Sequence, residues 1–318
     1  MRKFLFYLIS VFLLFLTFAL VYNPQRYITA CIEGLTIWML TVLPSLLPFF
    51  FITLLLTNLG IAGRLAKKCA PLTSLLYNSG GEAGFVQIMS FISGYPVGAK
   101  LIAELYNEGV IDNNEATKIS LFTSTSGPMF IVGSVGIGMF SSKTVGIFLI
   151  CSHFLATILN GLIFRGLNKT ENNSVLKLKK YHGNLLYDCA YGSTISCLIV
   201  GCFIAVFYVF FQILNDFNIL SPITYIFEII FNDEKKALGF CAGLIELTNG
   251  CILLSKSIDP LSVSLTAFLI SFGGLSIIIQ STSFLKQAQV NIKIFILSKL
   301  TQAITTFFIC YILCKVGL

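Results

Sequence analysis

Charged residues are scarce in this sequence. The 318 residues include 21 Lys and Arg and 14 Asp and Glu, together 11% of the chain, whereas an ordinary soluble domain carries about 25%. Hydrophobic residues make up 56%, and the mean hydropathy is +0.88. A single core cannot shield this much apolar surface from water. The composition therefore excludes a water-soluble globular protein and predicts that lipid surrounds the chain.

Motifs for catalysis, metal binding and nucleic-acid binding are also missing. No GxSxG, HExxH or Walker pattern occurs. The ten cysteines form no CxxC pair, and most lie in apolar stretches, so we interpret them as small core residues. His153 and His182 have no second ligand at metal spacing, and the lysines and arginines are scattered singly. We expect neither an enzyme, a resident metal or cofactor, nor a nucleic-acid partner.

Seven stretches are long and apolar enough to cross a bilayer as helices, which takes about 20 residues. They are residues 4–22, 28–59, 118–140, 144–165, 191–214, 262–285 and 294–313. The second is overlong and contains Pro44 and Pro48, which predict a kink or a break. The expected fold class is an all-α polytopic membrane protein, with residues 1–318 forming one integral membrane domain.

Two further apolar stretches, residues 84–103 and 237–254, are interrupted by polar residues. The interruptions are Ser-Gly-Tyr-Pro at 93–96 and Glu-Leu-Thr-Asn-Gly at 246–250. We interpret both stretches as re-entrant helical hairpins, because irregular backbone at membrane depth is tolerated only where protein or a cavity surrounds it. Each precedes a long helix that is itself broken, by Thr-Ser-Thr-Ser-Gly-Pro at 123–128 and by Ser-Phe-Gly-Gly at 271–274. The sequence thus predicts two repeats, 84–140 and 237–285.

The positive-inside rule orients these segments. With a cytoplasmic N-terminus, seven spans and two hairpins place thirteen Lys and Arg on the cytoplasmic side and six on the other, by our assignment of the sequence. Residues 166–188 then form a basic cytoplasmic loop. The two hairpins enter from opposite faces, which makes the repeat inverted. Lys100 and Lys299 remain inside membrane segments.

Paired interrupted segments in two halves of a membrane protein indicate a secondary transporter's binding site, because half-helix ends direct backbone groups at the midplane. The candidate substrate-binding residues are Ser93, Gly94, Tyr95, Ser124, Ser126, Gly127, Thr248, Asn249, Gly273 and Gly274. The alternative for the breaks is simple kinks and close glycine packing between helices. The alternative for the hydroxyl residues is a bond to their own helix carbonyls.

The segments FISGYPVGAKL at 91–101, FTSTSGPMFIVG at 122–133 and GIGMF at 136–140, together with Glu115, resemble the YlbJ family of sporulation integral membrane proteins. That family belongs to the nucleoside-recognition, or Gate-domain, group, which is similar to concentrative nucleoside transporters. The resemblance implies export of dipicolinic acid from the mother-cell cytoplasm, in the cell membrane or outer forespore membrane of a spore-forming bacterium.

Dipicolinate is a planar dianion at neutral pH, so its site requires hydrogen-bond donors and a positive charge. Lys100 is the candidate cation, since ionisable residues inside membrane segments are commonly functional. Alternatively, Lys100 pairs with Glu104, at i+4 on the same helix. Glu246 is a candidate for holding a coupling Na⁺ or H⁺. On this basis Lys100→Ala is expected to reduce uptake.

Two other functions fit the same sequence features. One is a nucleoside or nucleobase carrier, which uridine would stabilise. The other is a non-transporting membrane scaffold or signalling protein of sporulation, for which loop 166–188 would matter more than the hairpin tips. The sequence leaves homo-oligomer formation open.

Overall fold

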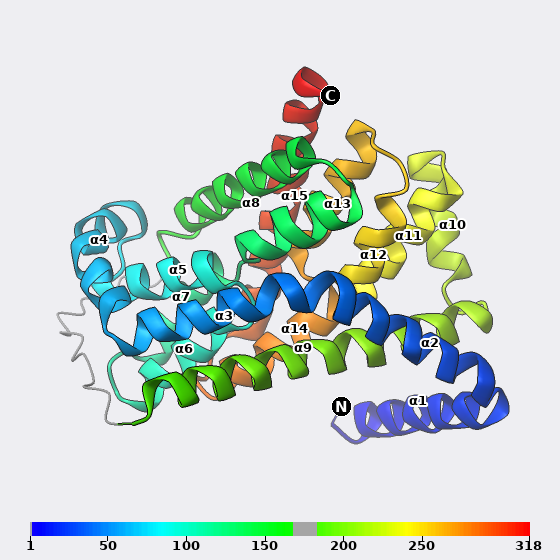
Figure 1. Ribbon diagram of the computed structural model, residues 1–318, viewed down its shortest axis with the longest axis horizontal. Helices are drawn as coiled ribbons and strands as arrows, with labels where there is room; N and C mark the ends of the chain where they lie inside the picture. Colours follow the sequence, from blue (N-terminus) through cyan, green and yellow to red (C-terminus); the bar gives the residue numbers. More distant parts are fainter. Residues whose placement is uncertain (1, 168–182) are drawn as a thin grey trace.

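The computed structural model describes residues 2–167 and 183–318, and the regular elements within these ranges are all helices (Figure 1). In chain order they are α1 (Arg2–Tyr22), α2 (Pro24–Ile37), η1 (Trp38–Val42), α3 (Leu43–Asn58), α4 (Ile61–Tyr77), α5 (Gly81–Ser93), α6 (Val97–Asn107), α7 (Asn113–Thr123), η2 (Met129–Met139), α8 (Lys143–Ile163), α9 (Leu185–Asp216), α10 (Ser221–Phe231), α11 (Glu234–Ile245), α12 (Leu247–Leu254), α13 (Pro260–Phe272), α14 (Gly274–Leu285) and α15 (Ile292–Gly317). The predicted all-α class is confirmed.

Five helical segments are long and apolar enough to cross a membrane. They are Pro24–Leu56, Lys143–Ile163, Leu185–Asp216, Pro260–Leu285 and Ile292–Gly317. The other two predicted spans, residues 4–22 and 118–140, are not among these five. Residues 4–22 lie within the 21-residue helix α1, and residues 118–140 are divided between α7 and η2. The division occurs at residues 124–127, which are not helical, whereas Pro128 is already helical.

The overlong segment from α2 to α3 changes helix type just ahead of Pro44. Residues Trp38–Val42 form the π-helical turn η1, and Pro44 follows at the second residue of α3. Proline cannot donate the amide hydrogen bond of a continuous α-helix, and a π-turn is one of the usual ways in which a helix absorbs such an interruption. Pro48 lies inside α3, which continues to Asn58. The predicted kink is therefore a local π-turn, and the segment is not cut in two.

The same order of elements occurs twice in the chain. We define the first unit as α5, α6, α7 and η2, and the second unit as α11, α12, α13 and α14. In each, two short helices meet at an irregular tip and two further helices meet at a break. The tips are residues 94–96 and Glu246, and the breaks are residues 124–128 and Gly273. All four lie at the positions predicted from the polar interruptions.

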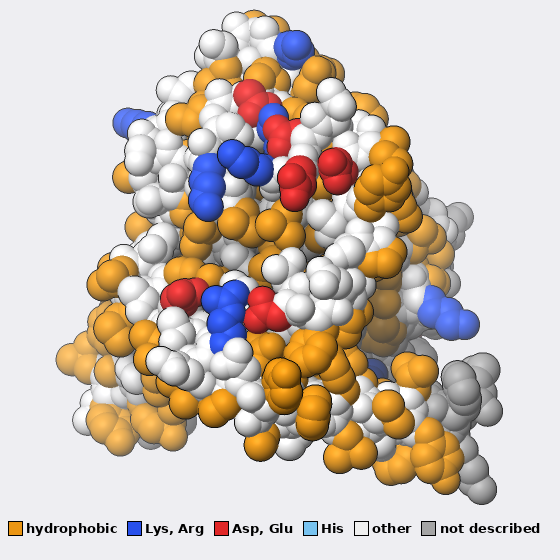
Figure 2. All heavy atoms as spheres, turned by 90° about the vertical axis from the view of Figure 1, so that its right-hand side faces the viewer, with side chains coloured by type: hydrophobic (Ala, Val, Ile, Leu, Met, Phe, Trp, Pro, Cys, Tyr) orange, Lys and Arg blue, Asp and Glu red, His pale blue; other side chains and the backbone are white. Residues whose placement is uncertain are grey.

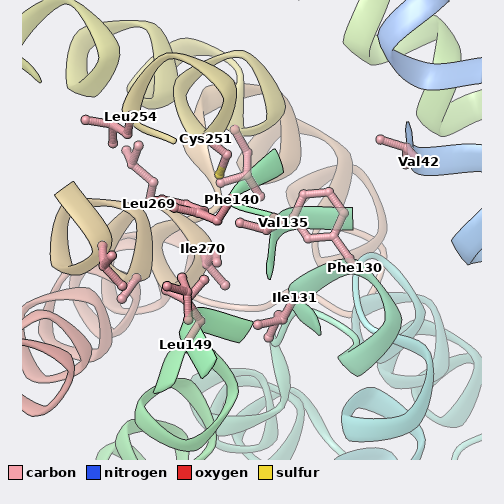
Figure 3. Packing of buried hydrophobic residues seen from close by; sticks show 14 of the residues in the cluster. Val42, Phe130, Ile131, Val135, Phe140, Leu149, Cys251, Leu254, Leu269 and Ile270 are labelled. Carbon is pink, nitrogen blue, oxygen red and sulfur yellow. The ribbon is translucent and has the colours of Figure 1, made fainter. Parts of the chain in front are cut away.

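Helices α8 and α15 hold the two units together. α15 packs on α13 and α8, and α8 packs on η2. On another side of the molecule α9 runs alongside α2 and α3 (Figure 1). The central buried cluster combines η2, α8, α12 and α13, and Figure 3 shows Ile131 of η2, Leu149 of α8 and Ile270 of α13 converging. The core thus fixes the first unit against the second.

The outer surface is largely apolar. Leu40 of η1, Leu198 of α9 and Phe308 of α15 are among many large hydrophobic side chains that are half or more exposed. Figure 2 shows a face on which hydrophobic side chains predominate and most charged ones gather in two groups. A soluble monomer rarely exposes continuous apolar patches of this kind, so the surface is suited to lipid contact.

Lys118 and the loop 166–188 both contributed to the count of cytoplasmic Lys and Arg that oriented the segments. Lys118 is buried, and its Nζ donates to the backbone oxygen of Asn78 at 2.7 Å, so it does not flank a span at the surface. Most of the predicted basic loop 166–188, namely residues 168–182, lies outside the described residues.

Candidate functional site

The first tip and the first break are packed backbone on backbone. Gly94 ends α5 with φ at +77°, a conformation that favours glycine. A Cβ at Gly94 would collide with the backbone nitrogen of Gly127 and come within 2.9 Å of its Cα. Thr125 adds a second link, because its hydroxyl donates to the Ser90 carbonyl at 2.9 Å. The SGYP and TSTSGP motifs therefore form one joint.

The second tip is organised by Glu246. This residue separates α11 from α12 in extended backbone geometry and acts as the N-cap of α12, accepting the Asn249 N–H at 2.8 Å. Gly250, one turn into α12, packs on the backbone of Gly243 in α11. Gly274, with φ at +67°, lies against the Gly243 carbonyl at a distance that leaves no space for a Cβ. This joint is also backbone on backbone.

Tyr95 connects the two units directly. Its phenol oxygen lies 3.1 Å from the Ile270 carbonyl and 3.3 Å from the Ser271 carbonyl, near the end of α13. A helix break leaves carbonyls without their usual amide donors, and the single phenol hydrogen of Tyr95 supplies a donor to this pair. The first tip thereby satisfies part of the second break.

His153 of α8 forms a second connection between the breaks. Its Nε2 accepts the Ser126 N–H at 3.0 Å, and its Nδ1 lies 2.7 Å from Ser271 Oγ. Because Nε2 is an acceptor here, a neutral imidazole carries its proton on Nδ1 and donates to Ser271. Ser271 Oγ in turn lies 2.7 Å from Thr306 Oγ1, whose hydroxyl donates to the Gln302 carbonyl. The hydrogen bonds run in one direction from the first break to α15.

Lys299 of α15 completes the polar centre. It is 1% exposed, and its Nζ donates to Tyr95 Oη at 2.7 Å and to the Ser124 carbonyl at 2.9 Å. The ammonium group also lies 4.8 Å from the centre of the Tyr95 ring. No carboxylate of the described residues is within ion-pair distance of it.

A pocket, called the cavity below, lies where these elements meet. Its lining residues are Val42, Leu46, Phe50, Ser93, Tyr95, Ser126, Gly127, Phe130, Val200, Phe203, Ile204, Glu246, Leu247, Thr248, Ser276, Ile277 and Gln280. The walls are mostly aliphatic and aromatic, and the polar groups come from both units.

The structure brings together six of the predicted site residues on this cavity: Ser93, Tyr95, Ser126, Gly127, Glu246 and Thr248. Five others are buried or form the backbone joints without lining it: Gly94, Ser124, Asn249, Gly273 and Gly274.

Lys100 does not line the cavity. Its side chain is 56% exposed, and its Nζ lies 4.0 Å from Glu104 Oε1, one turn along α6. The neighbours Ala99, Ile102 and Ala103 form the buried face of α6, so Lys100 points the other way. The structure shows the pairing with Glu104, the alternative stated above, and places Lys100 outside the cavity lining.

Because Lys100 lies outside the cavity lining, we no longer expect Lys100→Ala to reduce uptake. The substitution removes an exposed i,i+4 ion pair, which contributes at most about 0.5 kcal/mol. We expect ligand binding and transport to match the parent protein, measured as labelled-ligand uptake into proteoliposomes containing equal amounts of protein. A marked loss of uptake would return Lys100 to the site.

Among the predicted site residues, two buried side-chain atoms have no hydrogen-bond partner in the described part of the chain: Ser93 Oγ and Asn249 Nδ2. Buried polar groups in native proteins are nearly always hydrogen-bonded, and an exception calls for an explanation. Ser93 is 2% exposed and lines the cavity. A ligand atom in the cavity would supply the hydrogen-bond partner that its hydroxyl lacks.

Sequence reasoning did not select Lys299 or His153 for the site. Both lie in uninterrupted apolar helices, α15 and α8, where no break draws attention to them. The rule that ionisable residues within membrane segments are functional candidates applies to Lys299 as well as to Lys100. Position relative to the break favoured Lys100, which is six residues past Gly94 but on the wrong face.

Comparison with known proteins adds two matches. A family model described as Gate, nucleoside recognition, matches residues 39–163, a range that includes the first unit and α8. The sporulation integral membrane protein YlbJ of Bacillus subtilis (strain 168) is 30% identical over 325 aligned residues, covering 93% of this chain and 80% of that protein. No solved structure matches the chain.

Proposed function

The chain belongs to the YlbJ family of sporulation integral membrane proteins, and from that premise we propose that it transports a small anionic metabolite, dipicolinic acid, out of the mother-cell cytoplasm. The observation that carries the proposal is the cavity at the junction of two tips and a broken helix, lined by polar groups of both units. Irregular backbone inside a membrane protein is typical of secondary transporters' binding sites. A transport function requires no catalytic group.

In the proposed topology the pairs α5–α6 and α11–α12 are re-entrant hairpins that enter from opposite faces. The two units are then an inverted repeat, as in concentrative nucleoside transporters, and the N-terminus is cytoplasmic. The recurring element order and the backbone-packed joints support this arrangement. The membrane concerned is the cell membrane or the outer forespore membrane.

The cavity suits a planar aromatic ligand. Phe50, Phe130 and Phe203 contribute aromatic surface, against which a flat ring packs well. At one side, the Ser93 hydroxyl offers a hydrogen-bond donor to a carboxylate. Both parts of an aromatic dicarboxylate thus find matching groups.

Glu246 is proposed as the coupling group. Among the described residues that line the cavity it is the one with a formal charge. An anionic ligand entering beside a carboxylate is repelled unless a proton or a cation accompanies it. Uptake of H⁺, or of Na⁺, by Glu246 would therefore be linked to binding of the anion.

The polar residues that line the cavity also favour a second candidate, a nucleoside or nucleobase carrier. Glu246, Thr248 and Gln280 together offer acceptors and donors for the hydroxyl and amide groups of a neutral ligand. A neutral ligand meets no repulsion from Glu246. The matched family model, nucleoside recognition, supports this candidate as well.

A ligand panel separates the candidates. Purified protein in detergent is heated with dipicolinate, uridine, a nucleobase or benzoate, with and without sodium, and uptake of the stabilising compound into proteoliposomes follows. We expect dipicolinate at about 100 times its Kd to raise unfolding stability by about 2.7 kcal/mol. Stabilisation by uridine alone would identify a nucleoside carrier, and no response to any compound would favour a scaffold.

A further inference from the structure

We propose that Lys299 is the residue that selects anionic ligands for the cavity, acting through Tyr95. The inference rests on the proposed transport function, since it concerns the ligand of the same cavity. It assigns the charge requirement of the site to α15, an element outside both units. The ligand class that it specifies is a small carboxylate.

Lys299 has no negatively charged partner within ion-pair distance among the described residues. An ammonium group removed from water needs a compensating negative charge, because burial of an isolated charge is costly. The acceptors of Lys299 are a phenol oxygen and a backbone carbonyl, both neutral. His153, the nearby titratable group on α8, accepts an N–H at Nε2 and supplies no negative charge. The counter-charge for Lys299 is therefore absent from the described protein around it.

Tyr95 connects Lys299 to the cavity. Tyr95 lines the cavity, and Lys299 contacts both its phenol oxygen and its ring face. The other acceptor of Lys299 is the Ser124 carbonyl, two residues before Ser126 on the cavity wall. Lys299 thus holds both parts of the first unit that border the cavity.

Ser93 Oγ is buried on the same cavity and precedes Tyr95 by two residues. A carboxylate accepting from Ser93 would lie on the wall that Lys299 supports through Tyr95. Attraction between opposite charges is stronger in the low-dielectric interior of a protein than in water.

The test compares ligands that differ in charge but little in shape: dipicolinate and its neutral diamide, pyridine-2,6-dicarboxamide. Wild-type protein is expected to bind dipicolinate at least about tenfold more tightly than the diamide, measured by isothermal titration in detergent. Lys299→Met is expected to abolish that preference, so that the ratio of the two affinities falls to about one whatever loss of affinity the two ligands share. Lys299→Arg keeps a positive charge and is expected to keep the preference, even if both affinities fall.

Lys118→Met is the matched control, because Lys118 is equally buried but bonds to Asn78 and does not line the cavity. It is expected to lower stability without changing the ratio of the two affinities. An unchanged ratio in Lys299→Met would overturn the inference. If that variant does not fold, equal binding of the two ligands by wild-type protein overturns it. Failure of wild-type protein to bind dipicolinate at all instead counts against the proposed function.

Discussion

Replacing Glu246 by Gln is expected to remove the pH dependence of dipicolinate binding and to abolish concentrative transport. Two unit charges about 5 Å apart repel by about 3 kcal/mol at an effective dielectric constant of about 20, which corresponds to about 100-fold in affinity. A proton on Glu246 removes this repulsion. Wild-type affinity should therefore be highest at acid pH and fall as the pH rises, whereas Glu246→Gln should bind with the acid-form affinity throughout.

The measurement is isothermal titration in sodium-free buffer between about pH 6 and 9, a range in which the ligand remains a dianion because ordinary carboxyl groups titrate near pH 4. Proteoliposome uptake with and without a pH gradient then tests coupling. Glu234→Gln is the matched control, since it makes the same change at an exposed position of the same unit. Equal pH profiles for wild-type protein and Glu246→Gln would contradict proton coupling at this residue, and restoration of binding by sodium would assign the role to that ion.

The positions at which helices stop were predictable because each is marked by residues that helices in lipid avoid. Gly94, Gly127 and Gly273 fall within short polar runs in otherwise apolar stretches, and the structure breaks its helices there. The number of continuous spans was less predictable. Hydropathy alone joins residues 118–140, because the apolar residues on both sides of 124–128 outweigh the break.

Some of the cavity residues were predictable from the sequence and others were not. Ser93, Tyr95 and Glu246 could be identified because they occupy the tips themselves. Lys299 could not be ranked above Lys100, because distance along the chain from a break does not determine which face of a helix carries a side chain. The apolar walls from α3 and α9, such as Leu46 and Phe203, come from segments far from either unit, and only the packing of these helices brings them to the site.

Gly94→Ala is expected to destabilise the protein by about 2–6 kcal/mol. About 1–3 kcal/mol comes from placing an alanine at φ +77° and ψ −165°, a backbone region that is essentially restricted to glycine. A further 1–3 kcal/mol, roughly, comes from overpacking, since the new methyl group would overlap the backbone of Gly127 and neither chain segment can turn aside as a flexible side chain could. Thermal unfolding in detergent measures the loss, and dipicolinate should no longer stabilise the variant because the joint borders the cavity.

Gly60→Ala is the control for a glycine of positive φ that is not closely packed. Gly60 has φ at +70° and ψ at 11°, in the left-handed α region, and a Cβ there meets nothing within 4 Å. This variant should therefore show only the smaller, conformational loss and retain its response to dipicolinate. Equal destabilisation of the two variants would mean that the close approach of residues 94 and 127 contributes nothing to stability. In that case the hydrogen bonds of Tyr95 and His153 would maintain the cavity, and the backbone contact between residues 94 and 127 would not be needed for it.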